Sequence, residues 1–360
     1  MRTPIEIGVL FSRSGSYALL GETCRHGALR AIAEIEADSS LPFRFIPVEF
    51  DPGGNVDRYR PLCAQILGTT RARHIVGCVT SWSRKEVIPE LEKAGGTLWY
   101  PCPYEGFEAS EHVVYAHACP NQHLLPLLRW TFPRFGRRGY LVGSNYIWGW
   151  EVGRVARDLI LDAGGEALGD RYVPIGDTDV DRLVAEIRAT RPNFVLNSLI
   201  GPSSYAFLEA YAALGREDPY FTAATSPVLS CNLTESELGA LGDSGEGLIS
   251  AGPYFRDPNL PGAFGSSFEA AAYGAVRTLA AKLGAGRPDA DLATLLARPT
   301  NGGLKLDART QHAVLPVAIA QVRDGVFRTL ARWEDVAPDP YLSRRDSCPA
   351  SSRPPLSVVS

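Results

Sequence analysis

Short apolar runs alternate with stretches of helical periodicity from residue 5 onward. Five strands are predicted in this part of the chain, at residues 5–11, 43–50, 74–78, 97–100 and 112–115. The apolar stripes between the first four runs are amphipathic, which predicts helices packed on a sheet. A β-α-β order of this kind predicts the α/β class with a doubly wound parallel sheet.

The polar, proline-containing stretch at residues 118–122 interrupts the alternation, which then starts again. Strands are predicted at residues 139–143, 171–174, 194–198, 220–222 and 247–250. An irregular segment at residues 251–255 indicates a second crossing between the two parts, and the apolar run 313–322 with the hairpin-like residues 324–325 indicates a third. We therefore predict two doubly wound parallel-sheet lobes that are joined by a multi-strand hinge and enclose a cleft.

The crossings divide the predicted lobes along the chain. The first lobe is expected at residues 1–119 plus 254–315, the second at 120–253 plus 316–340, and a flexible tail at 341–360.

Composition narrows the class of protein. The 360 residues are 45% hydrophobic and 21% charged with a net charge of −4, which predicts a packed globular protein and argues against direct binding of nucleic acid. No apolar stretch approaches the roughly 20 residues that cross a membrane, so no membrane insertion is expected. The amino terminus enters a strand almost directly, without an export signal, and a cytoplasmic location is expected.

Cysteines and motifs point away from metal and cofactor chemistry. The seven cysteines lie at scattered spacings, which suits reduced thiols rather than disulfides, and no metal-ligand spacing occurs. A dinucleotide-binding GxGxxG, a Walker A motif and a GxSxG nucleophile motif are all missing. We expect no metal, no cofactor and no catalytic residue.

The segment at residues 77–89 contains the leading candidate for a binding residue. Ser81 lies between the carboxyl end of the predicted strand 74–78 and the start of a helix, where ligands of open parallel sheets bind. Its hydroxyl and the free N–H groups of the helix start can bind a carbonyl oxygen. The alternative interpretation is that Ser81 only caps its own helix.

Loops that follow other predicted strands carry hydroxyl groups and aromatic rings. They include residues 100–104, 144–148, 200–203 and 224–226, with Glu105 as an inward-facing carboxylate. This composition predicts a small, neutral, partly polar ligand held between rings. For any single ring a place in the core is the better interpretation, and it is the coincidence of rings at five strand ends that favours a site. Cys102 is the one candidate nucleophile, and no His lies in a neighbouring loop to activate it, so a pocket-lining thiol is the preferred interpretation.

Several motifs resemble one family. Asp51-Pro52-Gly53-Gly54, the block from Tyr100 to Glu108 (Tyr-Pro-Cys-Pro-Tyr-Glu-Gly-Phe-Glu), residues 120–122, residues 143–147 and residues 251–255 are similar to those of type I periplasmic-binding-protein-like proteins. Within that fold they resemble the branch that binds short-chain amides and urea, and most of all the AmiC-type amide sensors, the negative regulators of aliphatic amidase operons. The likeness covers about residues 5–341.

The resemblance implies a function and a set of site residues. Such sensors bind a small amide between their lobes and, without inducer, hold an RNA-binding antitermination regulator inactive. The implied ligand-binding residues are Ser81, Val79, Tyr100, Cys102, Pro103, Tyr104, Tyr146, Trp148 and Thr225. The expected partners are a small amide or urea-like ligand and an antitermination regulator, and a homo-oligomer is compatible with the chain.

Departures from the family pattern alter the predicted pocket wall. Val79, Cys102 and Trp148 stand where the sensors have an aromatic residue, Thr and Tyr, and Ala224 replaces one of a Thr pair. The resemblance therefore supports an amide-like ligand without specifying which amide. Two alternatives stay open: the solute-binding subunit of a urea or short-chain amide ABC transporter, and an enzyme that acts on an amide through Cys102.

Overall fold

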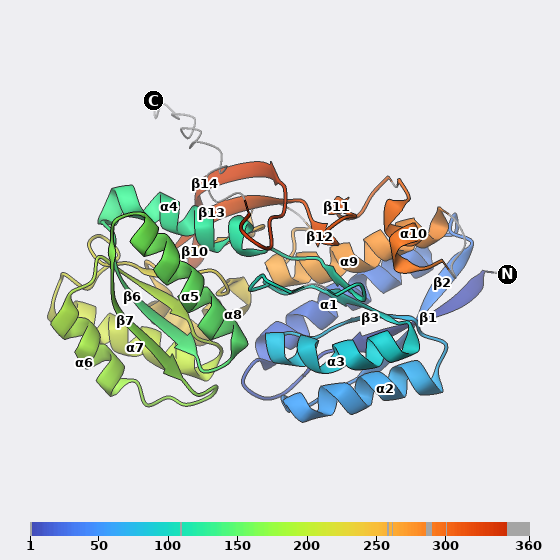
Figure 1. Cartoon of the computed structure of the whole chain (residues 1–360), viewed down its shortest axis with the longest axis horizontal. Coiled ribbons are helices and arrows are strands. Elements are labelled where there is room, and N and C mark those ends of the chain that lie inside the picture. Colours follow the sequence, from blue (N-terminus) through green and yellow to red (C-terminus); the bar gives the residue numbers. More distant parts are fainter. Residues whose placement is uncertain are drawn as a thin grey trace.

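The computed structural model describes residues 2–108, 110–257, 259–260, 262–285, 290–299 and 301–343, which form two lobes side by side (Figure 1). Each lobe contains a seven-stranded sheet with helices packed against it. This is the predicted α/β architecture, because the apolar runs are buried as parallel strands and the amphipathic stripes cover them.

The first lobe carries the sheet with strand order β11-β12-β5-β4-β3-β1-β2, which is parallel except for the pair β11–β12. Its strands are β1 (Thr3–Leu10), β2 (Phe43–Phe50), β3 (His74–Gly77), β4 (Thr97–Tyr100), β5 (Val113–Tyr115), β11 (Leu306–Asp307) and β12 (His312–Ala313). Its helices are α1 (Ala18–Ala37), η1 (Val56–Arg58), α2 (Tyr59–Thr69), α3 (Ser81–Ala94), α9 (Ser267–Gly284) and α10 (Leu292–Ala297).

The second lobe carries the sheet with strand order β14-β13-β10-β9-β8-β6-β7, which is antiparallel only at β10–β13–β14. Its strands are β6 (Arg138–Ser144), β7 (Glu166–Val173), β8 (Phe194–Ser198), β9 (Val228–Ser230), β10 (Ile249–Gly252), β13 (Leu315–Arg323) and β14 (Val326–Val336). The helices that follow β5 and those of this lobe are η2 (Pro120–Gln122), α4 (Leu124–Phe135), α5 (Ile147–Asp162), α6 (Asp181–Thr190), α7 (Pro202–Glu217), α8 (Glu235–Leu241) and η3 (Gly242–Gly245).

The chain passes between the two sheets three times. It leaves the first after β5, returns between β10 and α9, and crosses again from β12 to β13 through the single residue Val314. These crossings form the multi-strand connection that the sequence predicts, and α9 packs beside α1 although more than two hundred residues separate them (Figure 1).

The predicted strand at residues 220–222 is wrong. Asp218 organises these residues as a turn, since its carbonyl accepts from the N–H of Phe221 and its carboxylate from the N–H of Tyr220. Both rings pack against neighbours instead of entering the sheet, and the strand at this position is β9.

Most of the predicted tail, residues 344–360, lies outside the described residues. Before it, Leu342 is buried, and the hydroxyl of Tyr341 donates to the carbonyl of Glu108 at 3.1 Å. Residues 341–342 therefore pack on the first lobe.

The lobes touch one another across the cleft. The rings of Trp82 in α3 and Tyr146 before α5 have centroids 5.6 Å apart, and the guanidinium of Arg154 in α5 lies 4.8 Å from the ring centroid of Phe107. At a third point the backbone of Gly201, with φ at +59°, approaches the first lobe so closely that a Cβ there would lie 1.9 Å from the carbonyl oxygen of Ser16.

Candidate functional site

A small cavity of about 20 Å³ lies between the lobes, at the carboxyl ends of β3, β4 and β9. Its lining comes from both lobes and consists of Leu20, Val79, Ser81, Tyr100, Pro103, Tyr146, Trp148, Ile200, Asn232 and Phe268. The structure thus brings six of the predicted site residues around one space. None of these lining residues carries a charged side chain.

Ser81 is placed by the end of β3 and the start of α3. The cap of α3 is Thr80, whose Oγ1 accepts from the N–H of Ser83 at 3.2 Å, while Ser83 Oγ accepts from the N–H of Thr80 at 3.1 Å. This reciprocal pair satisfies the helix end, so the interpretation of Ser81 as the cap is wrong. Ser81 occupies the first helical position, where its backbone N–H has no acceptor within the helix.

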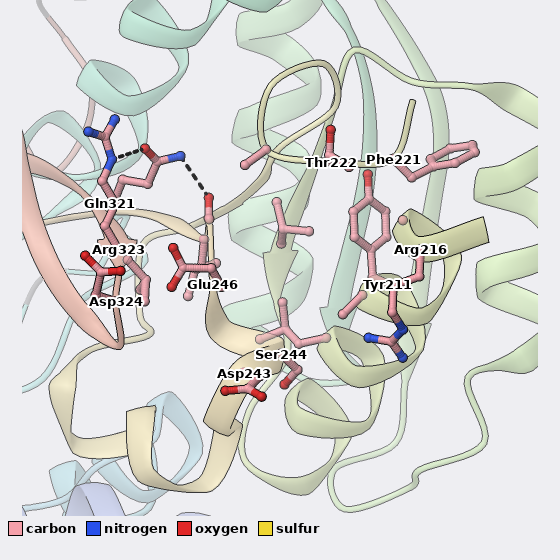
Figure 2. A pocket seen from close by; sticks show the side chains of 18 residues that line it. Tyr211, Arg216, Phe221, Thr222, Asp243, Ser244, Glu246, Gln321, Arg323 and Asp324 are labelled. Atoms are coloured by element: carbon pink, nitrogen blue, oxygen red, sulfur yellow. Dashed lines mark hydrogen bonds between the residues drawn. The ribbon is translucent and has the colours of Figure 1, made fainter. Parts of the chain in front are cut away.

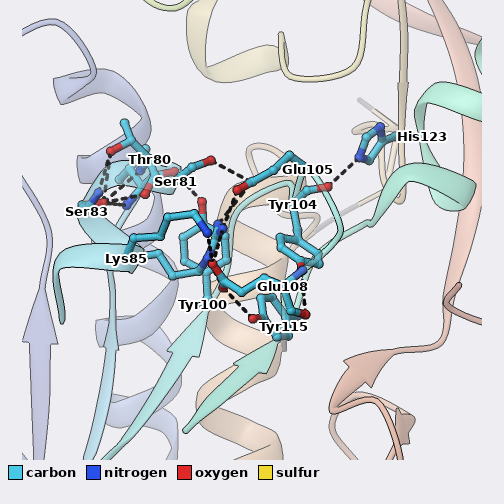
Figure 3. Close-up of polar contacts among 12 residues, drawn as sticks. Thr80, Ser81, Ser83, Lys85, Tyr100, Tyr104, Glu105, Glu108, Tyr115 and His123 are labelled. Atoms are coloured by element: carbon cyan, nitrogen blue, oxygen red, sulfur yellow. Dashed lines mark hydrogen bonds and ion pairs between the residues drawn. The ribbon is translucent and has the colours of Figure 1, made fainter. Parts of the chain in front are cut away.

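The hydroxyl of Ser81 donates to Glu105 Oε2 at 2.7 Å, and both side chains are buried (Figure 3). Glu105 lies in the loop after β4 and pairs with the fully buried Arg84, whose Nη2 is 2.6 Å from Glu105 Oε1. A carboxylate that is paired and hydrogen-bonded in this way can be buried without an unmet charge.

A second carboxylate completes this buried cluster. Glu108 accepts from Arg84 Nε at 2.8 Å, from Lys85 at 2.5 Å and from the hydroxyl of Tyr115 at 2.7 Å. Burial acts to raise the pKa of Glu108, but Arg84 and these hydrogen bonds outweigh it and lower the pKa to about 2. Two cations therefore face two carboxylates, and the cluster of Arg84, Lys85, Glu105 and Glu108 is neutral.

Aromatic rings and one amide form the remaining walls. Tyr100 is fixed because its hydroxyl donates to the carbonyl of Val79 at 2.9 Å. Burial raises the pKa of the Tyr146 hydroxyl, with Glu105 adding to the effect, so Tyr146 is neutral. Asn232, in the loop after β9, donates from Nδ2 to the carbonyl of Leu199 at 3.1 Å and accepts at Oδ1 from Ser230.

Three predicted site residues do not line the cavity. Cys102 is buried beneath it, with its sulfur 3.8 Å from the sulfur of Cys24 and 3.6 Å from the carbonyl of Cys78. Burial raises the pKa of this thiol well above its usual value, which opposes the thiolate that a nucleophile requires. Tyr104 packs behind the cavity on Tyr115, with ring centroids 4.4 Å apart.

Thr225 is the third predicted site residue that does not line the cavity. It was expected there because a strand was wrongly predicted at residues 220–222. It lies exposed in the turn before β9, whereas the cavity is reached by the loop after β9, which supplies Asn232. Asn232, Leu20 and Phe268 are cavity residues that the sequence reasoning missed. Leu20 and Phe268 come from α1 and α9, whose apolar stripes are indistinguishable in sequence from ordinary core.

A larger groove of about 690 Å³ lies in the second lobe, away from the cleft (Figure 2). Its apolar floor includes Tyr211, Phe221 and Leu248, and its rim mixes cations with carboxylates such as Arg216 and Glu246. Thr222 and Ala223, which precede β9, border it, so this groove lies at the end of β9 opposite to the cavity.

Two further observations concern the described residues only. No group of three or more His, Cys, Asp or Glu side chains among them is arranged to hold a metal ion. None of the helices in this part of the chain combines the length and apolar character that spanning a membrane requires.

Two α/β lobes that enclose a small cavity at the carboxyl ends of their strands define the class of two-lobed small-molecule binding proteins. The family described as "Periplasmic binding protein domain" matches residues 5–278, and the chain belongs to this family. Its two lobes with parallel-dominated sheets have the type I periplasmic-binding-protein fold.

Solved structures of such proteins share the fold at low sequence identity. A solute-binding protein of an ABC transporter from Rhodopseudomonas palustris HaA2, in complex with p-hydroxybenzoic acid, is 20% identical with a TM-score of 0.81, over 93% of this chain and 98% of that one. The branched-chain amino acid transporter substrate-binding protein LivJ from Streptococcus pneumoniae, in complex with isoleucine, is 16% identical with a TM-score of 0.76, over 93% and 100%.

Proposed function

We propose that this protein binds a small neutral amide or urea between its lobes and is not an enzyme. The observation that carries the proposal is the uncharged lining of the cavity, combined with the neutral Arg84 cluster behind it. An amino acid or a benzoate brings charges that would have to be buried, and burial of an unpaired charge costs several kcal/mol.

Cavity size supports a ligand smaller than those of the two structural neighbours. A space of about 20 Å³ has room for roughly one water molecule, so acetamide or urea requires the walls to move, and a ligand with a benzene ring or a branched side chain requires them to move further. Rings on several sides favour a flat ligand, and Ser81 with the free N–H groups at the start of α3 offers hydrogen bonds to an amide group.

We further propose that binding is read out as a signal, with the protein as a cytoplasmic sensor that controls amidase-type gene expression through an antitermination regulator. The motifs shared with AmiC-type sensors support this role. The alternative is the solute-binding subunit of an amide or urea ABC transporter, which is supported by the likeness of the fold to the two transporter binding proteins described above. An adjacent amidase or antiterminator gene supports the sensor, whereas adjacent permease genes support the transporter.

Isothermal titration calorimetry tests the ligand class. Acetamide and urea are expected to bind, whereas isoleucine and 4-hydroxybenzoate are expected to bind far more weakly. Tighter binding of isoleucine or 4-hydroxybenzoate than of any amide would overturn the proposal. Release of ammonia during incubation with acetamide would instead identify an enzyme.

A further inference from the structure

Ser81 is the donor in its hydrogen bond with Glu105. An ionised carboxylate has no proton to donate, so the 2.7 Å contact between Ser81 Oγ and Glu105 Oε2 uses the hydroxyl proton of Ser81. Ser81 therefore has lone pairs, but no proton, left to offer the cavity that it lines.

Arg84 is the ion-pair partner of Glu105. The guanidinium is fully buried, can only donate, and bonds Glu105 through Nη2 at 2.6 Å to Oε1 and through Nη1 at 3.4 Å to Oε2. Glu108 is already shared among Arg84, Lys85 and Tyr115, so Glu105 supplies the remaining carboxylate of this neutral cluster (Figure 3).

The start of α3 carries hydrogen-bond donors, in contrast to the Ser81 side chain, which is left as an acceptor. The backbone N–H groups of Ser81 and Trp82 are at the first helical positions, where no carbonyl of the helix accepts from them, and the end of a helix favours an oxygen with partial negative charge. Ser81, which lines the cavity, thus combines a backbone donor with a side-chain acceptor.

We propose that Glu105 is a positioning residue that sets the hydrogen-bond polarity of the site by holding Ser81 as an acceptor. A ligand must then present a C=O group to the helix start and an N–H group to Ser81 Oγ. Primary and secondary carboxamides and ureas meet this requirement, whereas ketones, esters and tertiary amides do not. The inference rests on the proposed function and specifies the ligand chemistry of the same site.

Glu105→Gln is the decisive variant because it reverses the bond at Ser81. The Gln oxygen stays with Arg84, which can only donate, so the Gln NH₂ occupies the position of Oε2 and donates to Ser81 Oγ. Ser81 then turns its own proton toward the cavity. Acetamide and acetone have nearly the same shape, and only acetamide carries N–H groups, so this pair measures the polarity.

The wild-type protein is expected to bind acetamide at least tenfold more tightly than acetone, and Glu105→Gln is expected to reduce that ratio about tenfold. Glu108→Gln is the matched control, since Glu108 bonds Arg84 but does not contact Ser81, and its ratio should equal that of the wild type. Thermal melts define a temperature at which each variant is folded.

A second variant covers the case in which Glu105→Gln does not fold. Ser81→Ala removes the acceptor itself and should also bring the ratio of acetamide to acetone affinity close to one. Acetone that binds the wild type as tightly as acetamide, or an unchanged ratio in Glu105→Gln, overturns the role of Glu105 while leaving amide binding in place. A wild type that binds neither acetamide nor urea overturns the proposed function, and this inference with it.

Discussion

At the scale of single residues, Thr80 and Ser81 are neighbours with separate roles at the start of α3. Thr80 forms the helix cap with Ser83, whereas Ser81 turns its side chain to Glu105 and the cavity. Ser81→Ala is therefore expected to lower affinity for acetamide about 2- to 13-fold, from the loss of one hydrogen bond, with little change in melting temperature.

Thr80→Ala is the matched control for this prediction. It should lower the free energy of unfolding by about 1 kcal/mol, because the cap is lost, with a smaller effect on affinity. Calorimetric titration and thermal melts of both variants separate the two roles. An early-melting Ser81→Ala that binds acetamide normally would contradict the assignment of Ser81 to the site.

Trp148 is predicted to limit the length of the ligand. Its ring lines the cavity and is only 3% exposed, and its indole N–H has no hydrogen-bond partner in the part of the chain that the structure describes. Trp148→Phe enlarges the space, so the affinity of propionamide relative to acetamide should rise about fourfold, the value of one buried CH₂ group.

Competition binding measures this ratio, and Trp150→Phe serves as its control. Trp150 lies in the same helix, is exposed and is not part of the cavity lining. An unchanged ratio in Trp148→Phe, or the same rise in Trp150→Phe, would contradict the prediction.

Where a predicted strand was correct, most of the site residues predicted at its carboxyl end line the cavity. They are Val79, Ser81, Tyr100, Pro103, Tyr146 and Trp148, whereas Cys102 and Tyr104 lie behind it although β4 was predicted correctly. The direction of the Ser81–Glu105 bond could not be predicted, because it depends on how the loop after β4 folds back over α3. Thr225 does not line the cavity, because the strand before it was predicted eight residues too early. A shift of this size places a loop at the opposite end of the sheet.

At the scale of elements, α8 buries a carboxyl group that makes stability depend on pH. Glu237 is 1% exposed and accepts a hydrogen bond from Tyr205 at 3.0 Å, while its Oε2 has no hydrogen-bond partner among the described residues. Burial raises the pKa of Glu237 from 4.5 to about 8. Below pH 4.5 the carboxyl is protonated in the folded and unfolded states alike. Between pH 4.5 and about pH 8 it is protonated in the folded state but ionised in the unfolded state.

The wild-type protein should therefore lose stability relative to Glu237→Gln as the pH rises from about 5 to about 8, by at most about 1.4 kcal/mol per pH unit. Urea unfolding of both proteins at several pH values gives this difference, and groups that titrate in both proteins cancel. A difference that is constant with pH, or that grows in the opposite direction, would show that Glu237 is not buried as a neutral acid.

Element bounds were predictable where an apolar run and its flanking breakers agreed. The strands β2, β4 and β8 begin and end at the predicted residues. Strand β9 has only three residues and follows Pro227, which is too short a run to show an apolar pattern. The aromatic pair Tyr220 and Phe221 in the turn before it was therefore predicted as the strand.

At the scale of the whole molecule, the three crossings allow the lobes to move as bodies while residues such as Trp82 and Tyr146 hold them together across the cleft. A ligand favours the closed arrangement only by its higher affinity for that state. X-ray scattering should therefore give a smaller radius of gyration with saturating acetamide than without it. An unchanged radius would exclude signalling by lobe closure.

The close approach of Gly201 to Ser16 has a practical consequence, because a single methyl group there acts as a wedge. In Gly201→Ala the new Cβ would lie 1.9 Å from the carbonyl oxygen of Ser16, which real structures do not tolerate. The two lobes then cannot approach each other as closely at this point, so scattering should give the larger radius even with saturating acetamide, and affinity should fall.

Gly242→Ala separates the wedge from simple backbone strain. Gly242 has nearly the same backbone angles as Gly201, with φ of 51° and ψ of −136° against 59° and −136°, but no atom of the other described residues, beyond its chain neighbours, lies within 4 Å of a Cβ built there. Gly242→Ala should lower the melting temperature, as Gly201→Ala should, but the radius of gyration of the protein should still decrease with acetamide. A Gly201→Ala protein that contracts like Gly242→Ala would contradict the wedge, whereas one that stays open gives a form locked in the unliganded state, with which any partner that distinguishes the two states can be sought.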